Sequence, residues 1–168
     1  MISTRKHRRW ANFSGSGVVI GLISYALFAQ YVLGLEACPL CIFQRVAFIA
    51  AGVIFLIAGI HSPVGVGSRL YGAGALVISV VGMGIAGFHV YIQNLPEDQV
   101  PPSCGAGLNY MLDVFGPLEA VRMVFTSAGE CADINWQFLS LSMPGWALVW
   151  FVLLGTLAVL ANGKRITN

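Results

Sequence analysis

Hydrophobic residues gather in four long stretches of the chain, and polar residues fill the segments between them. The stretches cover residues 15–34, 42–60, 70–92 and 144–162. Each is close to the roughly 20 apolar residues that a helix needs to cross a bilayer. Because lipid offers no water to backbone polar groups, we expect every stretch to be helical. The pattern therefore predicts an all-α membrane protein, a single domain built as a four-transmembrane-helix bundle.

Two connections are short, the one between the first and second helices and the one between the second and third. Residues 93–143, between the third and fourth helices, form a long polar segment. Within it, "GPLEAVRMVF" predicts a short amphipathic helix, because proline is favoured at the first helical position and glutamate in the first turn. Its apolar side chains at helical spacing are Leu118, Val121, Val124 and Phe125. This helix would either cover the top of the bundle or lie in the headgroup plane. Further on, "SMPGW" offers Ser142 as the N-cap of the last helix, with Pro144 in its first turn.

Composition and charge agree with a membrane protein and orient it. The chain is 57% hydrophobic and 10% charged, whereas about 25% of the residues of a soluble domain are charged. In a four-span arrangement, one side of the membrane carries the cations Arg5, Lys6, Arg8, Arg9, Arg69, Lys164 and Arg165. By the positive-inside rule that side is cytoplasmic, so we expect both termini there. Residues 35–41 and 93–143 are then the outer loops, and we expect no nucleic-acid partner.

All four cysteines fall in these outer loops, Cys38 and Cys41 in the first and Cys104 and Cys131 in the second. If the membrane is a bacterial inner membrane, the loops face an oxidising compartment in which disulfides persist. A bond between Cys104 and Cys131 would stabilise the second loop by about 3–4 kcal/mol. Four cysteines nevertheless allow several connectivities, and the spacing alone leaves the pairing open.

The pair in "EACPLCIFQR" is harder to explain as a structural disulfide. A bond between Cys38 and Cys41 closes a very small loop, so it adds little stability. The C-x-x-C spacing is instead typical of an exchangeable bond with a reactive thiolate. A zinc site of the usual kind needs a second pair of ligands, which the isolated Cys104 and Cys131 do not supply. The spacing therefore favours a redox-active dithiol, and no metal site is predicted.

Two further side chains are candidates for holding a cofactor. Arg45 follows Cys41 by one helical turn, and an arginine inside an apolar span is costly and usually marks function; the alternative is that it snorkels to the outer headgroups. A cation there would stabilise negative charge on a membrane-dissolved electron acceptor, which points to a quinone. His89 and Gln93 stand one turn apart near the outer end of the third helix. They would line the same pocket, unless His89 is an interfacial residue bonded to a neighbour.

With "CPLCIFQR", "HVYIQNLPEDQVPPSCGAGL" and "GECADINWQFLSLSMPGW" in place, the chain resembles the disulfide bond formation protein B family over nearly its whole length. The resemblance implies a bacterial inner-membrane oxidoreductase with periplasmic cysteines. It also implies a relay in which a DsbA-like thioredoxin-fold oxidase attacks Cys104, and Cys131 then exchanges with Cys38. Cys41 would pass the electrons to ubiquinone or menaquinone beside Arg45. No role is implied for Gln44.

The alternative is a structural membrane subunit whose disulfides brace its outer loops. It predicts that Cys38→Ser lowers stability without a redox defect. The relay predicts that the same substitution abolishes electron transfer.

Overall fold

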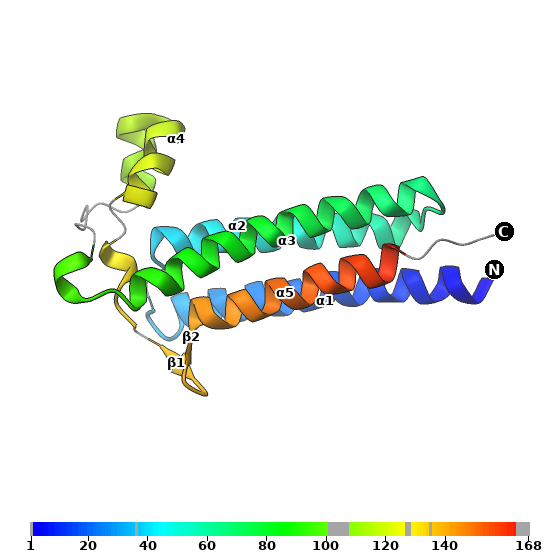
Figure 1. The fold of residues 1–168 in the computed structure, drawn as a ribbon, viewed down its shortest axis with the longest axis horizontal. Coiled ribbons are helices and arrows are strands. Elements are labelled where there is room, and N and C mark those ends of the chain that lie inside the picture. Colours follow the sequence, from blue (N-terminus) through cyan, green and yellow to red (C-terminus); the bar gives the residue numbers. More distant parts are fainter. Residues whose placement is uncertain (1, 36, 101–107, 127–128, 135, 164–168) are drawn as a thin grey trace.

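The computed structural model describes residues 2–35, 37–100, 108–126, 129–134 and 136–163 (Figure 1). Four long helices run side by side, and each is long and apolar enough to cross a membrane. They are α1 (Ile2–Tyr31), α2 (Pro39–His61), α3 (Val66–Gln93) and α5 (Met143–Asn162). The start of α1 and the end of α5 lie at one end of the bundle, and the loop elements gather at the other. The predicted four-helix membrane fold is confirmed.

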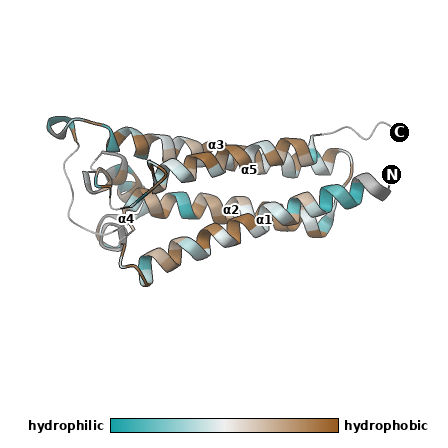
Figure 2. Cartoon of the chain, turned by 90° about the horizontal axis from the view of Figure 1, so that it is seen from below, coloured by the Kyte–Doolittle hydropathy of each residue, from teal (hydrophilic) through white to brown (hydrophobic). Residues whose placement is uncertain are grey.

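Apolar side chains both fill the bundle and cover it. α3 packs along α5, and α2 packs along both α1 and α3. At the centre the rings of Phe48 and Phe151 stack with their centroids 3.9 Å apart and their planes 7° from parallel. Gly82 leaves room for this stack, because a Cβ atom there would lie 2.3 Å from Phe151 Cε1. Many large apolar residues face outward along the middle of the helices, whereas hydrophilic residues cluster toward the ends (Figure 2).

The long outer segment carries the predicted short helix within α4 (Leu108–Thr126), after the 3-10 turn η1 (Glu97–Gln99). Gly116, at φ 77° and ψ 170°, interrupts α4 just before Pro117. Ala120 and Val124 then pack against a buried cluster at the end of the bundle, formed by Leu40, Ile92 and Cys131. Leu118 is 83% exposed, so the packed face is narrower than the predicted apolar stripe. The Phe125 side chain lies outside the described residues.

A two-stranded hairpin, which the hydropathy pattern did not predict, leads into α5. β1 (Gln137–Phe138) pairs antiparallel with β2 (Leu141–Ser142). The two turn residues, Leu139 and Ser140, have φ of 51° and 63°. Such turns usually carry asparagine or glycine, and neither is present here to signal one. Ser142 does occupy the N-cap position of α5, but its hydroxyl donates to Gln93 Oε1 at 2.7 Å instead of capping the helix.

Candidate functional site

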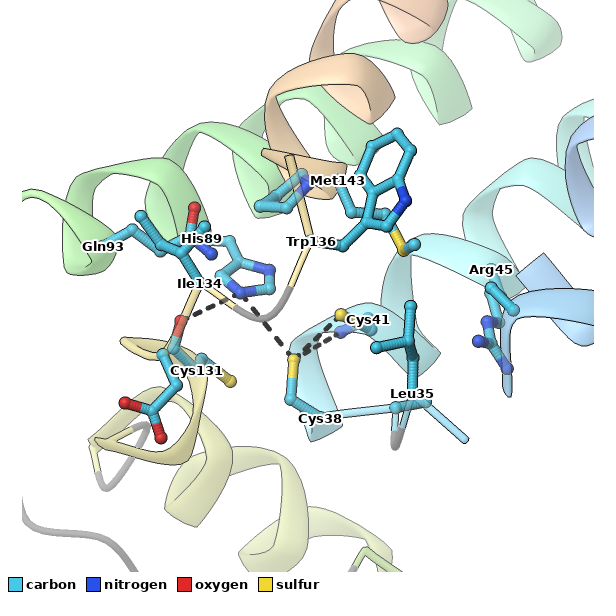
Figure 3. A pocket seen from close by; sticks show the side chains of 14 residues that line it. Leu35, Cys38, Cys41, Arg45, His89, Gln93, Cys131, Ile134, Trp136 and Met143 are labelled. Atoms are coloured by element: carbon cyan, nitrogen blue, oxygen red, sulfur yellow. Dashed lines mark hydrogen bonds between the residues drawn. The ribbon is translucent and has the colours of Figure 1, made fainter. Parts of the chain in front are cut away.

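The end of the bundle that carries the start of α2 and the end of α3 encloses a cavity of about 290 Å³, which we call the thiol cavity (Figure 3). α2 and α3 supply one part of its wall, and the segment around the 3-10 turn η2 (Gly129–Cys131) supplies another. Its lining includes Cys38, Cys41, Arg45, His89, Gln93 and Cys131. The structure thus brings together five predicted site residues from α2 and its cap, α3 and the η2 turn, together with Gln93. The sixth predicted residue, Cys104, lies outside the described residues.

The start of α2 holds Cys38 and Cys41 together. Cys38 is the N-cap residue with extended backbone (φ −65°, ψ 160°), and Pro39 occupies the first turn, where its missing N–H leaves no hydrogen bond unmade. The Cys38 sulfur accepts a hydrogen bond from the Cys41 backbone N–H at 3.4 Å. The two Sγ atoms lie 2.9 Å apart, and both residues are free thiols. The helix cap therefore presents the dithiol ready for exchange.

Cys131 reaches the same point from the second outer loop. It is 1% exposed, and its Sγ lies within 4.8 Å of both Cys38 Sγ and a ring nitrogen of His89. Hydrogen bonding from the Cys38 thiol lowers the pKa of Cys131. The bonds that Cys38 makes to Cys131 and Cys41 raise the pKa of Cys38 itself. Of these two residues, Cys131 is therefore favoured as the thiolate and Cys38 as the thiol that donates to it.

His89 links the dithiol to the second loop. It is 2% exposed, and its Nε2 lies 3.1 Å from the Cys131 carbonyl oxygen and 3.7 Å from Cys38 Sγ. On the other side of the ring, the Gln44 side-chain amide lies 3.1 Å from Nδ1. If the Gln44 N–H donates to Nδ1, the ring proton sits on Nε2 and donates to the Cys131 carbonyl. This arrangement satisfies both ring nitrogens without a charge.

Arg45 is tied to the first helix. One guanidinium nitrogen donates to Gln30 Oε1, and the other donates to the Ala26 carbonyl oxygen at 3.2 Å. The side chain is half-buried and lines the thiol cavity with Cys41, although Figure 3 shows it at the far side from His89. These hydrogen bonds to α1 and the place of Arg45 in the cavity wall favour a role in the cavity over the alternative, in which its side chain snorkels to the headgroups.

A second, more apolar cavity of about 250 Å³ adjoins the first, and we call it the aromatic cavity. Cys41, Arg45, Trp136 and Met143 line both cavities. The aromatic cavity is otherwise walled by α1, α2, α5 and the hairpin, with Tyr25, Phe48, Phe138, Trp146 and Trp150 among its lining side chains. Trp136 stands edge-on to Tyr25, with ring centroids 6.1 Å apart. The arrangement offers an apolar space that is lined by both a thiol and a cation held by α1.

One of these residues escaped the sequence analysis. Gln44 was given no role, yet it is 5% exposed and bonds to His89. The sequence did hold a signal for it, a polar side chain inside an apolar helix, three residues after Cys41. The place of Trp136 between the two cavities depends on a hairpin that the hydropathy pattern did not predict.

Comparison with known proteins agrees with this site. The family described as "Disulfide bond formation protein DsbB" matches residues 8–161. A "Disulfide bond formation protein B" of Nitrosococcus oceani is 44% identical over 156 residues, which cover 93% of this chain and 92% of the relative. Proteins of the same description from Xanthomonas campestris and Saccharophagus degradans are 48% and 51% identical, covering 86% and 79% of this chain and 84% and 80% of their own length. The chain therefore belongs to the DsbB family of disulfide bond formation proteins, an oxidoreductase family, and is a multi-pass membrane protein.

Proposed function

We propose that this protein reoxidises a DsbA-like periplasmic dithiol oxidase and passes the electrons through two cysteine pairs to a membrane quinone. The observation that carries the proposal is the position of Cys38 Sγ. It lies 2.9 Å from Cys41 Sγ and within 4.8 Å of Cys131 Sγ. The Cys38 sulfur is thus close to the sulfurs of both Cys41 and Cys131, and the relay requires it to form a disulfide with each of them in turn.

In the first exchange, a thiolate of the reduced partner attacks Cys104 of a Cys104–Cys131 disulfide. The new bond joins the partner to Cys104, and Cys131 leaves as a thiolate. The pairing of Cys104 with Cys131 stays a prediction, because Cys104 lies outside the described residues.

In the second exchange, the Cys131 thiolate attacks Cys38 of a Cys38–Cys41 disulfide, forming Cys38–Cys131 and releasing Cys41 as a thiolate. The second thiol of the partner then displaces Cys104, which leaves the partner oxidised. Attack of Cys104 on Cys131 restores the loop disulfide and releases Cys38. The net result is that one partner disulfide has formed and Cys38 and Cys41 hold the two electrons as a dithiol.

The residues around Cys41 fit a ubiquinone or menaquinone. The aromatic cavity is apolar, includes Trp136 and Trp146, and has the Arg45 guanidinium on its wall. A quinone held there would accept the two electrons and two protons that the dithiol gives up. Arg45 would attract negative charge on the acceptor, and its hydrogen bonds to α1 hold the cation in place beside Cys41.

The same proposal sets the orientation. Arg5, Lys6, Arg8 and Arg9 lie at the start of α1, at the end of the bundle opposite the cysteines. The positive-inside rule places that end in the cytoplasm of a bacterial inner membrane. The thiol cavity then faces the periplasm, where the partner oxidase acts.

The test is an anaerobic reaction of the purified protein with reduced partner and quinone, following quinone absorbance. Wild type should reduce one quinone for each partner disulfide formed. Cys41→Ser should form no quinol, while Ser79→Ala, a substitution deep in α3 away from both cavities, should retain activity. Full quinone reduction by Cys41→Ser, or partner oxidation at full rate in a quinone-depleted wild-type preparation, would refute the proposal.

A further inference from the structure

We propose that the reduced protein binds one thiophilic divalent cation, of which Zn²⁺ is the type, through Cys38 Sγ, Cys131 Sγ and His89 Nε2. These three donor atoms all lie within 4.8 Å of one another. They come from the cap of α2, the outer part of α3 and the η2 turn, so the cysteine spacing gave no sign of the site. Two thiolates and an imidazole are a ligand set that suits zinc.

The distances are close to those of a tetrahedral zinc site. Zinc–sulfur bonds of about 2.3 Å and zinc–nitrogen bonds of about 2.0 Å place two ligand sulfurs about 3.8 Å apart and a sulfur and a nitrogen about 3.5 Å apart. Cys38 Sγ and His89 Nε2 already lie 3.7 Å apart. The remaining donor pairs, at 4.8 Å or less, need only a small inward movement of side chains.

Burial favours the same site. Cys131 and His89 are buried and Cys38 is half-buried, so little water competes for the ion. The fourth coordination position faces the thiol cavity, where water has room. Cys41 Sγ, 2.9 Å from Cys38 Sγ, is also close enough to take that position after a small separation of the two sulfurs.

Gln44 provides the supporting contact that a histidine ligand needs. To bind metal, Nε2 must give up its proton and its bond to the Cys131 carbonyl, and the ring proton then sits on Nδ1. Half a turn of the Gln44 amide presents Oε1 to that Nδ1–H, 3.1 Å from the present position of the amide nitrogen. A ligand histidine that donates its second N–H to an oxygen is the usual arrangement at zinc sites.

Metal binding and disulfide exchange exclude each other at these sulfurs. Both Cys38 and Cys131 must be thiolates to bind the ion. A thiolate that is bound to the ion is a weaker nucleophile and is held away from the disulfide that it would attack. The cation should therefore keep the fully reduced protein, in which neither disulfide is formed, out of the exchange; this consequence, unlike binding itself, rests on the proposed function. Because the Cys38 thiol has to ionise, binding should release protons near neutral pH.

The binding test uses tag-free protein in detergent, reduced and without partner or quinone, with Zn²⁺ in competition with a chromophoric chelator. We expect one ion per wild-type chain, release of protons on binding, and no binding after oxidation to disulfides. Cys38→Ser, Cys131→Ser and His89→Ala should each weaken binding by roughly 100-fold or more, and Gln44→Leu by about tenfold. Gln44→Glu should tighten binding, because a carboxylate is the stronger acceptor for the histidine N–H.

A matched control removes a histidine at the other end of the bundle. His61→Ala, beside Tyr71, should bind like wild type. Co²⁺ in place of Zn²⁺ should show a thiolate charge-transfer band that Cys38→Ser and Cys131→Ser lose. Absence of stoichiometric binding to the reduced wild type would overturn the proposal, and so would unchanged affinity in Cys38→Ser, Cys131→Ser or His89→Ala. Since no readout here involves quinone, a failure of the relay would leave these results unaffected.

Discussion

The side chain of Gln44 faces the ring of His89 inside the protein: the amide Nε2 lies 3.1 Å from His89 Nδ1, and both side chains are buried. The Cys131 carbonyl can only accept a hydrogen bond, so the ring proton lies on Nε2, and the Gln44 amide N–H then donates to Nδ1. These two hydrogen bonds connect the start of α2 to the segment of Cys131 through the single side chain of His89. The consequences of this connection can be measured directly.

Gln44→Leu should leave the buried Nδ1 of His89 without the hydrogen bond from Gln44. Loss of one buried hydrogen bond corresponds to roughly 1–1.5 kcal/mol, so we expect about a tenfold loss of turnover. Nitrogen NMR of labelled histidine should show a protonated Nε2 and an unprotonated Nδ1 in wild type, and a shifted Nδ1 resonance in the variant. A wild-type His89 with its proton on Nδ1 would contradict the assignment.

Arg45 is expected to act through its charge, and Gln30 through the position of that charge. Arg45→Met should raise the KM for quinone and lower turnover, because the cation on the wall of the aromatic cavity is lost. Gln30→Ala keeps the cation and removes one of its bonds to α1, so its effect should be smaller. Steady-state kinetics with a soluble quinone distinguish the two variants. Equal changes of KM and turnover in both would show that the Arg45 charge is not what promotes quinone reduction.

The cysteines should differ in how their reactivity depends on pH. The Cys38 thiol hydrogen bond lowers the pKa of Cys131, so the Cys131 thiolate should persist to lower pH than an ordinary thiol. Cys38→Ala removes the donor and should move the midpoint of Cys131 alkylation to higher pH. Cys38→Ser retains a donor and serves as the control.

Peptide mass spectrometry after brief alkylation with a small reagent gives this midpoint for Cys131 alone. An identical midpoint in Cys38→Ala and Cys38→Ser would mean that the hydrogen bond has no part in ionising Cys131.

Much of the fold followed from the sequence because lipid imposes a strong rule. Long apolar stretches in a membrane must be helices, and the start of the last helix was visible in Ser142 and Pro144. The dithiol was equally visible, because Cys38 and Cys41 are close in the chain. By contrast, Cys38 and His89 are 51 positions apart and His89 and Cys131 are 42. No local pattern reports such contacts, which arise from how the loops fold over the bundle.

The packing around Gly82 gives a prediction for the stability of the bundle. Gly82→Ala would place a Cβ 2.3 Å from Phe151 Cε1 and disturb the stack with Phe48. We expect a loss of about 1–3 kcal/mol in the free energy of unfolding, as for overpacked cores. Gly84→Ala, in the same helix with no atom within 4 Å of its added Cβ, should be neutral or stabilising by up to about 1 kcal/mol. The free energy of unfolding of both variants can be measured in detergent. Equal values would contradict the close contact between Gly82 and the Phe151 ring.

The most direct test of the account is the identity of the disulfide that joins the two outer loops during the reaction. The oxidised protein, free of quinone and oxygen, is mixed with a partner that carries only its attacking cysteine, then acid-quenched, alkylated and mapped by mass spectrometry. The account predicts a Cys38–Cys131 disulfide, an alkylated Cys41 and a partner bound to Cys104. A Cys41–Cys131 disulfide, or partner bound to Cys104 with no disulfide between the loops, would contradict it.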